Sequence, residues 1–327
     1  MSRRLLVLAW HNVDPTWCFP APGGDRGLER QLAFLARRCN VVPLAEGLRA
    51  LDRGDPLPPR AVALTFDDGY RDQLELAAPM LARLGLPATF FLVPGLLDGT
   101  ARPWWELLAW ILTRSTRDSV VWEGRTLALG DDDQRRRSLA TALEALKRRD
   151  QLARDAALDE LSERCAPDGK LDEHASFLDW DGARQLARRG FTVASHSLNH
   201  AILAEESTDA QERDLTLSRR RLEGELEVPV ELLAYPNGKL PDYSQATVAA
   251  ARGAGYSHAL TTVEGWNQPT TAPYEIHRFV QQPERGAPGL ALVPLHPVWA
   301  RVRRLRDRHR QSSRSTTTSS GHNRYVE

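Results

Sequence analysis

The stretch Val62-Ala63-Leu64-Thr65-Phe66-Asp67-Asp68-Gly69 joins a short apolar run to two adjacent acidic residues. An apolar run of this length is typical of a strand that is buried on both faces of a parallel sheet. A second such run, at residues 5–9, ends shortly before His11. Because α/β folds place their sites at the carboxyl ends of strands, Asp67 and Asp68 are expected at a site.

The same alternation of strand and helix extends along the chain. Helical periodicity follows both runs, at residues 28–39 and 72–84, and the next strand is predicted at 88–93. In the second half the pattern predicts helices at 180–189, 209–226 and 244–254, and strands at 191–195, 232–235 and 257–261. Strands that alternate with helices predict an α/β fold with parallel strands, either open or closed into a barrel.

Residues from about 101 to 177 break this alternation. They contain a tryptophan-rich helix with Trp104 and Trp105, a hairpin around Glu123 and Gly124, and charged helices at 135–164. We expect a helical insertion that covers one end of the sheet or barrel, where it could carry substrate specificity. Its tryptophans would stack on a sugar or form a buried helix pair. The alternative is a surface insertion that adds only stability.

Composition and charge exclude several classes of protein. A chain of 327 residues with 42% hydrophobic residues can bury a substantial core, here predicted as one domain at residues 1–300. The 43 basic residues balance the 43 acidic ones, so nucleic acid is not an expected partner. The three cysteines, Cys18, Cys39 and Cys165, are widely spaced, which argues against a disulfide framework or a thiolate zinc site.

The two ends of the chain raise the question of location. Residues 1–10 resemble the beginning of a signal peptide, but the apolar run is too short and is interpreted as the first strand. No stretch reaches the roughly 20 apolar residues of a membrane span, so the cytoplasm is expected. Residues 301–327 are basic and then rich in serine and threonine, and they are predicted to be disordered. The arginines would be solvated or would contact the inner face of a membrane peripherally.

Two adjacent carboxylates are costly at the end of a buried strand, because they repel each other unless a cation or several donors compensate them. Neighbouring side chains diverge, so one aspartate can bind a metal while the other points at a water molecule. An Asp-Gly pair is also a common turn, which is the simpler interpretation of Asp67, Asp68 and Gly69 taken alone.

A pair of histidines follows the strand predicted at residues 191–195. If the chain is helical there, His196 and His200 lie on one face and can both bind a single ion. Two histidines and one aspartate form a ligand set that suits Zn²⁺, with Co²⁺, Ni²⁺ or Mn²⁺ as alternatives, and that leaves positions open for water and substrate.

These two motifs resemble those of the polysaccharide deacetylase family, also called the NodB-homology or carbohydrate esterase 4 family. Its motif T-F-D-D-G corresponds to Thr65-Phe66-Asp67-Asp68-Gly69, and its motif H-[ST]-x-x-H corresponds to His196-Ser197-Leu198-Asn199-His200. The resemblance implies a distorted (β/α) barrel with a helical insertion. It also implies that Asp68, His196 and His200 bind a divalent metal and that Asp67 is the general base.

The remaining family motifs are altered. The third, R-x-P-[YW]-G, corresponds to Ala234-Tyr235-Pro236-Asn237-Gly238. The resemblance implies that the backbone N–H of Asn237 donates to the oxyanion and that Tyr235 lines the site, while alanine replaces the arginine that would contact the base. The family's final histidine, which protonates the leaving group, would be His277, with His296 as a rival. His11 could also line the site or act as the acid.

The resemblance favours a metal-dependent hydrolase that removes N-acetyl groups from an amino sugar of a polysaccharide or glycan precursor. A deformylase or an O-acetyl esterase on the same barrel is one alternative. A carbohydrate-binding relative that has lost catalysis is another, because the third motif is altered.

Overall fold

The core of the protein is a single parallel sheet. The computed structural model describes residues 2–13, 24–171 and 176–281. The strands lie in the order β10-β1-β3-β4-β7-β8-β9, with β2 beside the start of β3. They are β1 (Leu6–Trp10), β2 (Asn40–Val41), β3 (Ala61–Phe66), β4 (Thr89–Leu92), β7 (Thr192–Ser195), β8 (Leu232–Ala234), β9 (His258–Leu260) and β10 (Phe279–Val280). Each predicted strand is confirmed to within one residue at either end.

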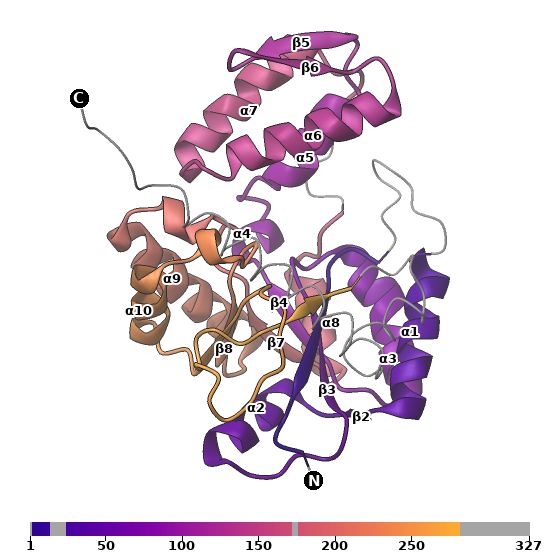
Figure 1. The fold of residues 1–327 in the computed structure, drawn as a ribbon, viewed down its shortest axis with the longest axis vertical. Coiled ribbons are helices and arrows are strands. Elements are labelled where there is room, and N and C mark those ends of the chain that lie inside the picture. Colours follow the sequence, from indigo (N-terminus) through magenta and orange to yellow (C-terminus); the bar gives the residue numbers. More distant parts are fainter. Residues whose placement is uncertain (1, 14–23, 172–175, 282–327) are drawn as a thin grey trace, which may run out of the picture.

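The two edges of this sheet meet the same segment of chain. Phe279 of β10 pairs with Leu8 of β1, and Ile276, just before it, forms a parallel bridge with Leu260 of β9. Because one segment contacts both edges, the sheet curls on itself (Figure 1). The fold is therefore a distorted (β/α) barrel rather than an open sheet.

Both faces of the strands are buried. Val7 and Ala63 belong to the apolar cluster inside the barrel. Their neighbours Leu8 and Leu64 belong to the larger cluster between the sheet and the helices. Burial on both faces explains why these strands are continuously apolar in sequence instead of alternating with polar residues.

Helices surround the barrel, as Figure 1 shows. They are α1 (Gly24–Arg38), α2 (Leu44–Arg53), α3 (Ala78–Leu84), α4 (Pro94–Leu97), α8 (Trp180–Arg188), α9 (Thr208–Leu226) and α10 (Gln245–Gly253). Asp179 and Ser207 accept hydrogen bonds from the first turns of α8 and α9, and such caps fix where the helices begin. The sequence interpretation missed α2, although its buried residues Leu44, Leu48 and Leu51 have helical spacing.

The helix predicted at residues 72–84 begins as a π-helical turn, Gln73–Ala77. The side chain of Gln73 is fully buried, and its Nε2 donates to the carbonyl oxygens of Asp67 (2.5 Å) and His11 (3.0 Å). Gln73 therefore ties the end of β3 to the end of β1. Wider helical turns of this kind are frequent at functional sites.

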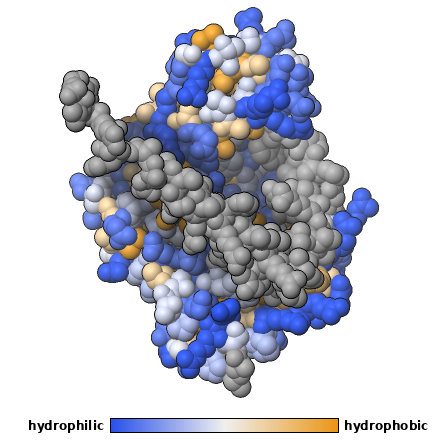
Figure 2. Space-filling view, viewed as in Figure 1, coloured by the Kyte–Doolittle hydropathy of each residue, from blue (hydrophilic) through white to orange (hydrophobic). Residues whose placement is uncertain are grey.

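The insertion has an apolar core of its own. It comprises α5 (Trp104–Thr113), the hairpin β5 (Ser119–Trp122) and β6 (Arg125–Ala128), α6 (Asp132–Leu146) and α7 (Gln151–Cys165). Figure 1 shows this layer standing beyond one end of the barrel, and Figure 2 shows a mostly hydrophilic surface on the visible side of it. Ile202 of the barrel packs into its core. The predicted hairpin and charged helices are confirmed.

Each helix in the described part of the chain is too short or too polar to cross a membrane. Cys165 is buried and Cys39 is half-buried, and both are free thiols. Cys18, His296 and the basic stretch from residue 301 lie outside the described residues, so the predictions made for them stay predictions.

Candidate active site

The two aspartates that follow β3 point in different directions. Asp68 and Gly69 both have left-handed backbone, with φ of 74° and 76°. A non-glycine residue adopts this conformation at some cost, so the turn is a strained one that the surrounding structure maintains. The sharp change of direction separates the carboxylates of Asp67 and Asp68, which are 1% and 4% exposed.

The histidine pair lies on a loop and not on a helix. This corrects the prediction that His196 and His200 share a helical face. Ser197 and His200 have left-handed backbone, with φ of 65° and 55°, so the segment after β7 cannot continue as a right-handed helix. Asp214 of α9 accepts a 2.8 Å hydrogen bond from the backbone N–H of Leu198 and so secures this loop.

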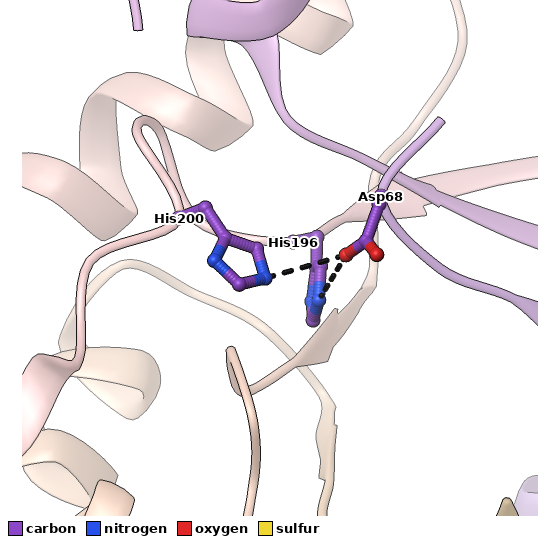
Figure 3. A group of neighbouring side chains, drawn as sticks. All are labelled: Asp68, His196 and His200. Carbon is purple, nitrogen blue, oxygen red and sulfur yellow. Dashed lines mark ion pairs between the residues drawn. The ribbon is translucent and has the colours of Figure 1, made fainter. Parts of the chain in front are cut away.

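The loop nevertheless brings both imidazoles to Asp68. Oδ1 of Asp68 lies 3.2 Å from Nε2 of His196 and 3.3 Å from Nε2 of His200, and Figure 3 shows the two rings directed at this carboxylate. One ligand atom from each residue lies within 4.8 Å of the other two, and all three side chains are buried. Buried nitrogen and carboxylate ligands converging in this way suit a divalent ion of the zinc type.

Hydrogen bonding of His196 is consistent with metal binding. Its Nδ1 lies 2.7 Å from the carbonyl oxygen of Ala234. A carbonyl can only accept, so Nδ1 carries a proton. Nε2 then donates to Asp68 when the ring is protonated, and its lone pair is available to a metal when the ring is neutral. The residue that replaces the family's third-motif arginine thus orients a candidate ligand through its backbone.

The pKa values of Asp68, His196 and His200 depend on burial and on the contacts among these side chains. Burial alone would raise the pKa of Asp68, but hydrogen bonds from His196 and His200 outweigh this and hold its pKa well below the usual range. Burial lowers the pKa of His200, and Asp68 only partly offsets this effect. For His196 the nearby carboxylates outweigh burial, and the pKa is raised.

Asp67 is paired with an arginine that the sequence interpretation missed. Nη1 of Arg278 lies 2.7 Å from Oδ1 of Asp67, and these side chains are 0% and 1% exposed. Burial would raise the pKa of Asp67, but the guanidinium of Arg278, helped by His196 and His11, holds it below the ordinary value. Arg278 therefore supplies the contact to the predicted base that Ala234 cannot make.

His277 faces away from this pair, which corrects its assignment as the acid. Successive side chains of an extended strand point to opposite faces, and Arg278 points inward. The imidazole of His277 packs instead against Gly265, where an added Cβ would lie 2.8 Å from it. The useful signal in the sequence was the alternation of Ile276 and Arg278, both buried, in the closing segment.

His11 does reach the site from the end of β1. Its Nε2 lies 3.8 Å from Oδ2 of Asp67, and its side chain is 37% exposed. An imidazole that is both beside the predicted base and accessible to solvent can exchange protons with a bound substrate.

In the third motif, Asn237 is the candidate for a backbone contact to the substrate, whereas the ring of Tyr235 lies away from the candidate site. The ring of Tyr235 is fully buried and stacks on Tyr243 at 4.8 Å between ring centroids. It packs in the cluster under the helices, so the prediction that it lines the site is wrong. Asn237 has left-handed backbone with φ of 57°, and its carbonyl accepts a 2.6 Å hydrogen bond from the hydroxyl of Thr262. That its N–H donates to an oxyanion stays a prediction.

Comparison with known proteins identifies the family. The sequence model of the polysaccharide deacetylase family matches residues 54–114 and 122–259, and the chain belongs to this family. YxkH of Bacillus subtilis (strain 168), which is described provisionally as a polysaccharide deacetylase, is 24% identical over 232 residues. The match covers 71% of this chain but 53% of YxkH, so the chain spans about half the length of this curated relative.

Solved structures share the fold. The Streptococcus pyogenes deacetylase PplD in complex with acetate superposes with a TM-score of 0.60 at 18% identity, covering 89% of this chain and 97% of PplD. IcaB from Ammonifex degensii superposes with a TM-score of 0.56 at 19% identity, covering 91% of this chain and 97% of IcaB. At these identities the similarity establishes the fold.

Proposed function

We propose that this protein is a metal-dependent hydrolase that removes N-acetyl groups from an amino sugar of a polysaccharide or glycan precursor. The observation that carries the proposal is that Asp67, held by Arg278, lies next to the buried cluster of Asp68, His196 and His200. A carboxylate base beside three converging metal ligands is an arrangement suited to hydrolysis of an acyl group.

The substrate class rests on the family. Polysaccharide deacetylation is the activity that gives the family its description, and the relative PplD is described as a deacetylase in complex with acetate. An amide is the more demanding acyl substrate, because the leaving amine has to be protonated. His11, which lies beside Asp67, is the group that can donate this proton. A deformylase and an O-acetyl esterase are the alternatives that the assay below separates.

Asp68, His196 and His200 are the residues that would hold the metal, with Zn²⁺ as the ion that best suits two imidazoles and a carboxylate. A divalent ion bound there would supply Lewis acidity to water and to the acetyl carbonyl.

The other roles fall to the protein itself. Asp67 takes a proton from the attacking water as the new C–O bond forms, and Arg278 keeps its carboxylate ionised and oriented. The backbone N–H of Asn237 donates to the oxyanion. His11 then gives a proton to the departing amine as the C–N bond breaks, leaving acetate and a free amino sugar.

The proposal is tested on purified full-length protein by metal analysis and an acetate-release assay over N-acetylated, O-acetylated and N-formylated amino sugars. About one divalent ion per chain is expected in the wild type. His196→Ala should lose it, whereas the control His258→Gln should keep it, because His258 pairs with Asp52 at the amino end of β9. Asp67→Asn should keep the metal and lose activity by about 10³-fold.

Each negative result removes a defined part of the proposal. Wild-type protein without metal would refute the ligand assignment. Unimpaired acetate release by Asp67→Asn would refute its role as the base. Release from O-acetylated or N-formylated substrates alone would replace the N-deacetylase with one of the alternatives.

A further inference from the structure

An aromatic residue of the insertion, Trp105, contacts the candidate metal centre. The indole of Trp105, in α5, lies against the imidazole of His200 with 4.2 Å between ring centroids and 45° between ring planes. His200 is 6% exposed, and Trp105 is half-buried. The neighbouring Trp104 is 1% exposed and is therefore a core residue of the insertion.

The orientation of this indole is fixed by buried hydrogen bonds. Nε1 of Trp105 donates to the hydroxyl of Tyr70 (2.7 Å), and that hydroxyl donates to Oε1 of Glu106 (2.6 Å). Tyr70 and Glu106 are 4% and 5% exposed. Phe177 stacks on Tyr70 and lies edge-on to Trp105, which leaves the indole little freedom to turn.

The hydrogen bond between Trp105 and Tyr70 also connects the two loops that carry the candidate ligands. Tyr70 directly follows the Asp67-Asp68-Gly69 turn, while Trp105 packs on the histidine loop. Residues of the insertion therefore bridge the two loops that carry the candidate ligands.

The two histidines differ in what orients them. Nδ1 of His196 is bonded to the carbonyl oxygen of Ala234. Nδ1 of His200 is buried and has no hydrogen-bond partner among the residues that the structure describes. A metal-binding imidazole is normally oriented by a hydrogen bond to its other nitrogen. For His200, the indole of Trp105 packs against the ring instead.

We propose that Trp105 is a positioning residue for His200, so that the helical insertion is a working part of the metal centre and not only a cover over it. This inference rests on the proposed function, because it takes His200 to be a ligand. It assigns the face of Trp105 to a histidine ring rather than to a sugar.

The test compares variants of the full-length protein by metal affinity and by the visible absorption spectrum of the Co²⁺-loaded form. Trp105→Leu removes the ring, and we expect it to weaken metal binding by about 10- to 100-fold, the usual effect of losing a residue that orients a ligand. Its Co²⁺ spectrum should change because the ligand geometry changes. Trp105→Phe and Tyr70→Phe keep a ring in place, so they should weaken metal binding and alter the Co²⁺ spectrum less than Trp105→Leu does.

Trp110→Phe is the matched control, because Trp110 lies on the same helix and packs against the core of the insertion. It should leave metal affinity and the Co²⁺ spectrum unchanged. Thermal unfolding of the metal-free proteins identifies any variant that fails to fold, and the two phenylalanine variants carry the test in that case.

The results distinguish this inference from the function on which it rests. Wild-type protein that binds no divalent ion overturns the proposed function. If the wild type binds metal and Trp105→Leu matches its affinity and spectrum, only the positioning role is overturned. A raised KM with unchanged kcat and metal affinity would make Trp105 a substrate contact and would also overturn it.

Discussion

Nη1 of Arg278 donates a 2.7 Å hydrogen bond to Oδ1 of Asp67 in the interior of the barrel. Nε of the same guanidinium donates to the carbonyl oxygen of Thr261 (2.9 Å). The bond to Thr261 fixes the orientation of the guanidinium independently of its bond to Asp67. The segment that closes the barrel thus also determines the charge and direction of the predicted base.

Removing the arginine should damage both stability and activity. Arg278→Met leaves the buried carboxylate of Asp67 without its partner, which costs about 3 kcal/mol or more of unfolding free energy. The pKa of Asp67 should rise, so the acid limb of the kcat/KM profile should move to higher pH. We expect kcat/KM at neutral pH to fall by about 100-fold. Chemical denaturation and a pH profile measure these effects.

A double substitution tests whether the loss comes from the pair. Asp67→Asn removes the buried negative charge, so adding it to Arg278→Met should recover much of the lost stability, although not the activity. Purely additive losses would show that the two side chains are not coupled. Arg278→Lys keeps the charge but not the fork geometry and should lie between the wild type and Arg278→Met.

Most of the barrel could be predicted because its signals are local. An apolar run such as residues 62–66 predicts a buried strand, and the periodicity of residues 209–226 predicts α9. The polar residues at the strand ends then indicated the candidate ligands. Asp68 and His196 could be placed near each other because the carboxyl ends of β3 and β7 face the same end of the barrel.

The missed features depend on contacts between distant segments. Whether Arg278 or His277 faces Asp67 follows from how residues 276–280 close the barrel against β1 and β9, and the local sequence does not show this. The helical spacing of His196 and His200 was misleading, because the left-handed backbone at Ser197 and His200 is stabilised by the surrounding packing and by Asp214.

Asp214 offers a test of how the histidine loop is held. Asp214→Ala leaves the backbone N–H of Leu198 without its acceptor, at a cost of about 1–3 kcal/mol. The loop should loosen, and metal affinity should fall by about 10-fold. Asp214→Asn keeps an oxygen acceptor at the same place and should bind metal like the wild type. If both variants bind metal normally, the loop does not depend on this hydrogen bond.

Gly95 of α4 lies against the same loop and leaves no room for a side chain. A Cβ at this position would lie 2.5 Å from Oδ1 of Asn199 and 2.8 Å from the carbonyl oxygen of Leu198. Gly95→Ala should therefore destabilise the protein by about 1–3 kcal/mol and weaken metal binding by displacing the loop.

Gly224 in α9 is the control for that substitution, because no described residue outside its own helix turn lies within 4 Å of a Cβ built there. Gly224→Ala should stabilise the protein by up to about 1 kcal/mol through helix propensity. Thermal unfolding and metal titration of the two variants provide the comparison. A Gly95→Ala protein that matches the wild type in both measurements would contradict the close packing of α4 on the loop.

Glu106 should make stability depend on pH. Burial, together with repulsion from Asp68 and Asp72, raises its pKa from 4.5 to about 7 even though Tyr70 donates a hydrogen bond to it. The folded state therefore binds the proton more tightly than the unfolded state does. The contribution of Glu106 to the free energy of unfolding is therefore complete below pH 4.5 and is lost as pH rises through 7, by about 3 kcal/mol at most.

Glu106→Gln accepts the same hydrogen bond from Tyr70 but stays neutral, so it should become more stable relative to the wild type as pH rises from 4.5 to 8. Denaturation curves at several pH values measure the difference. Glu144→Gln is the control, because it makes the same chemical change at a side chain that is 63% exposed. A constant difference for Glu106→Gln would mean that Glu106 ionises equally easily in the folded and unfolded protein, which would contradict the effect expected from its burial.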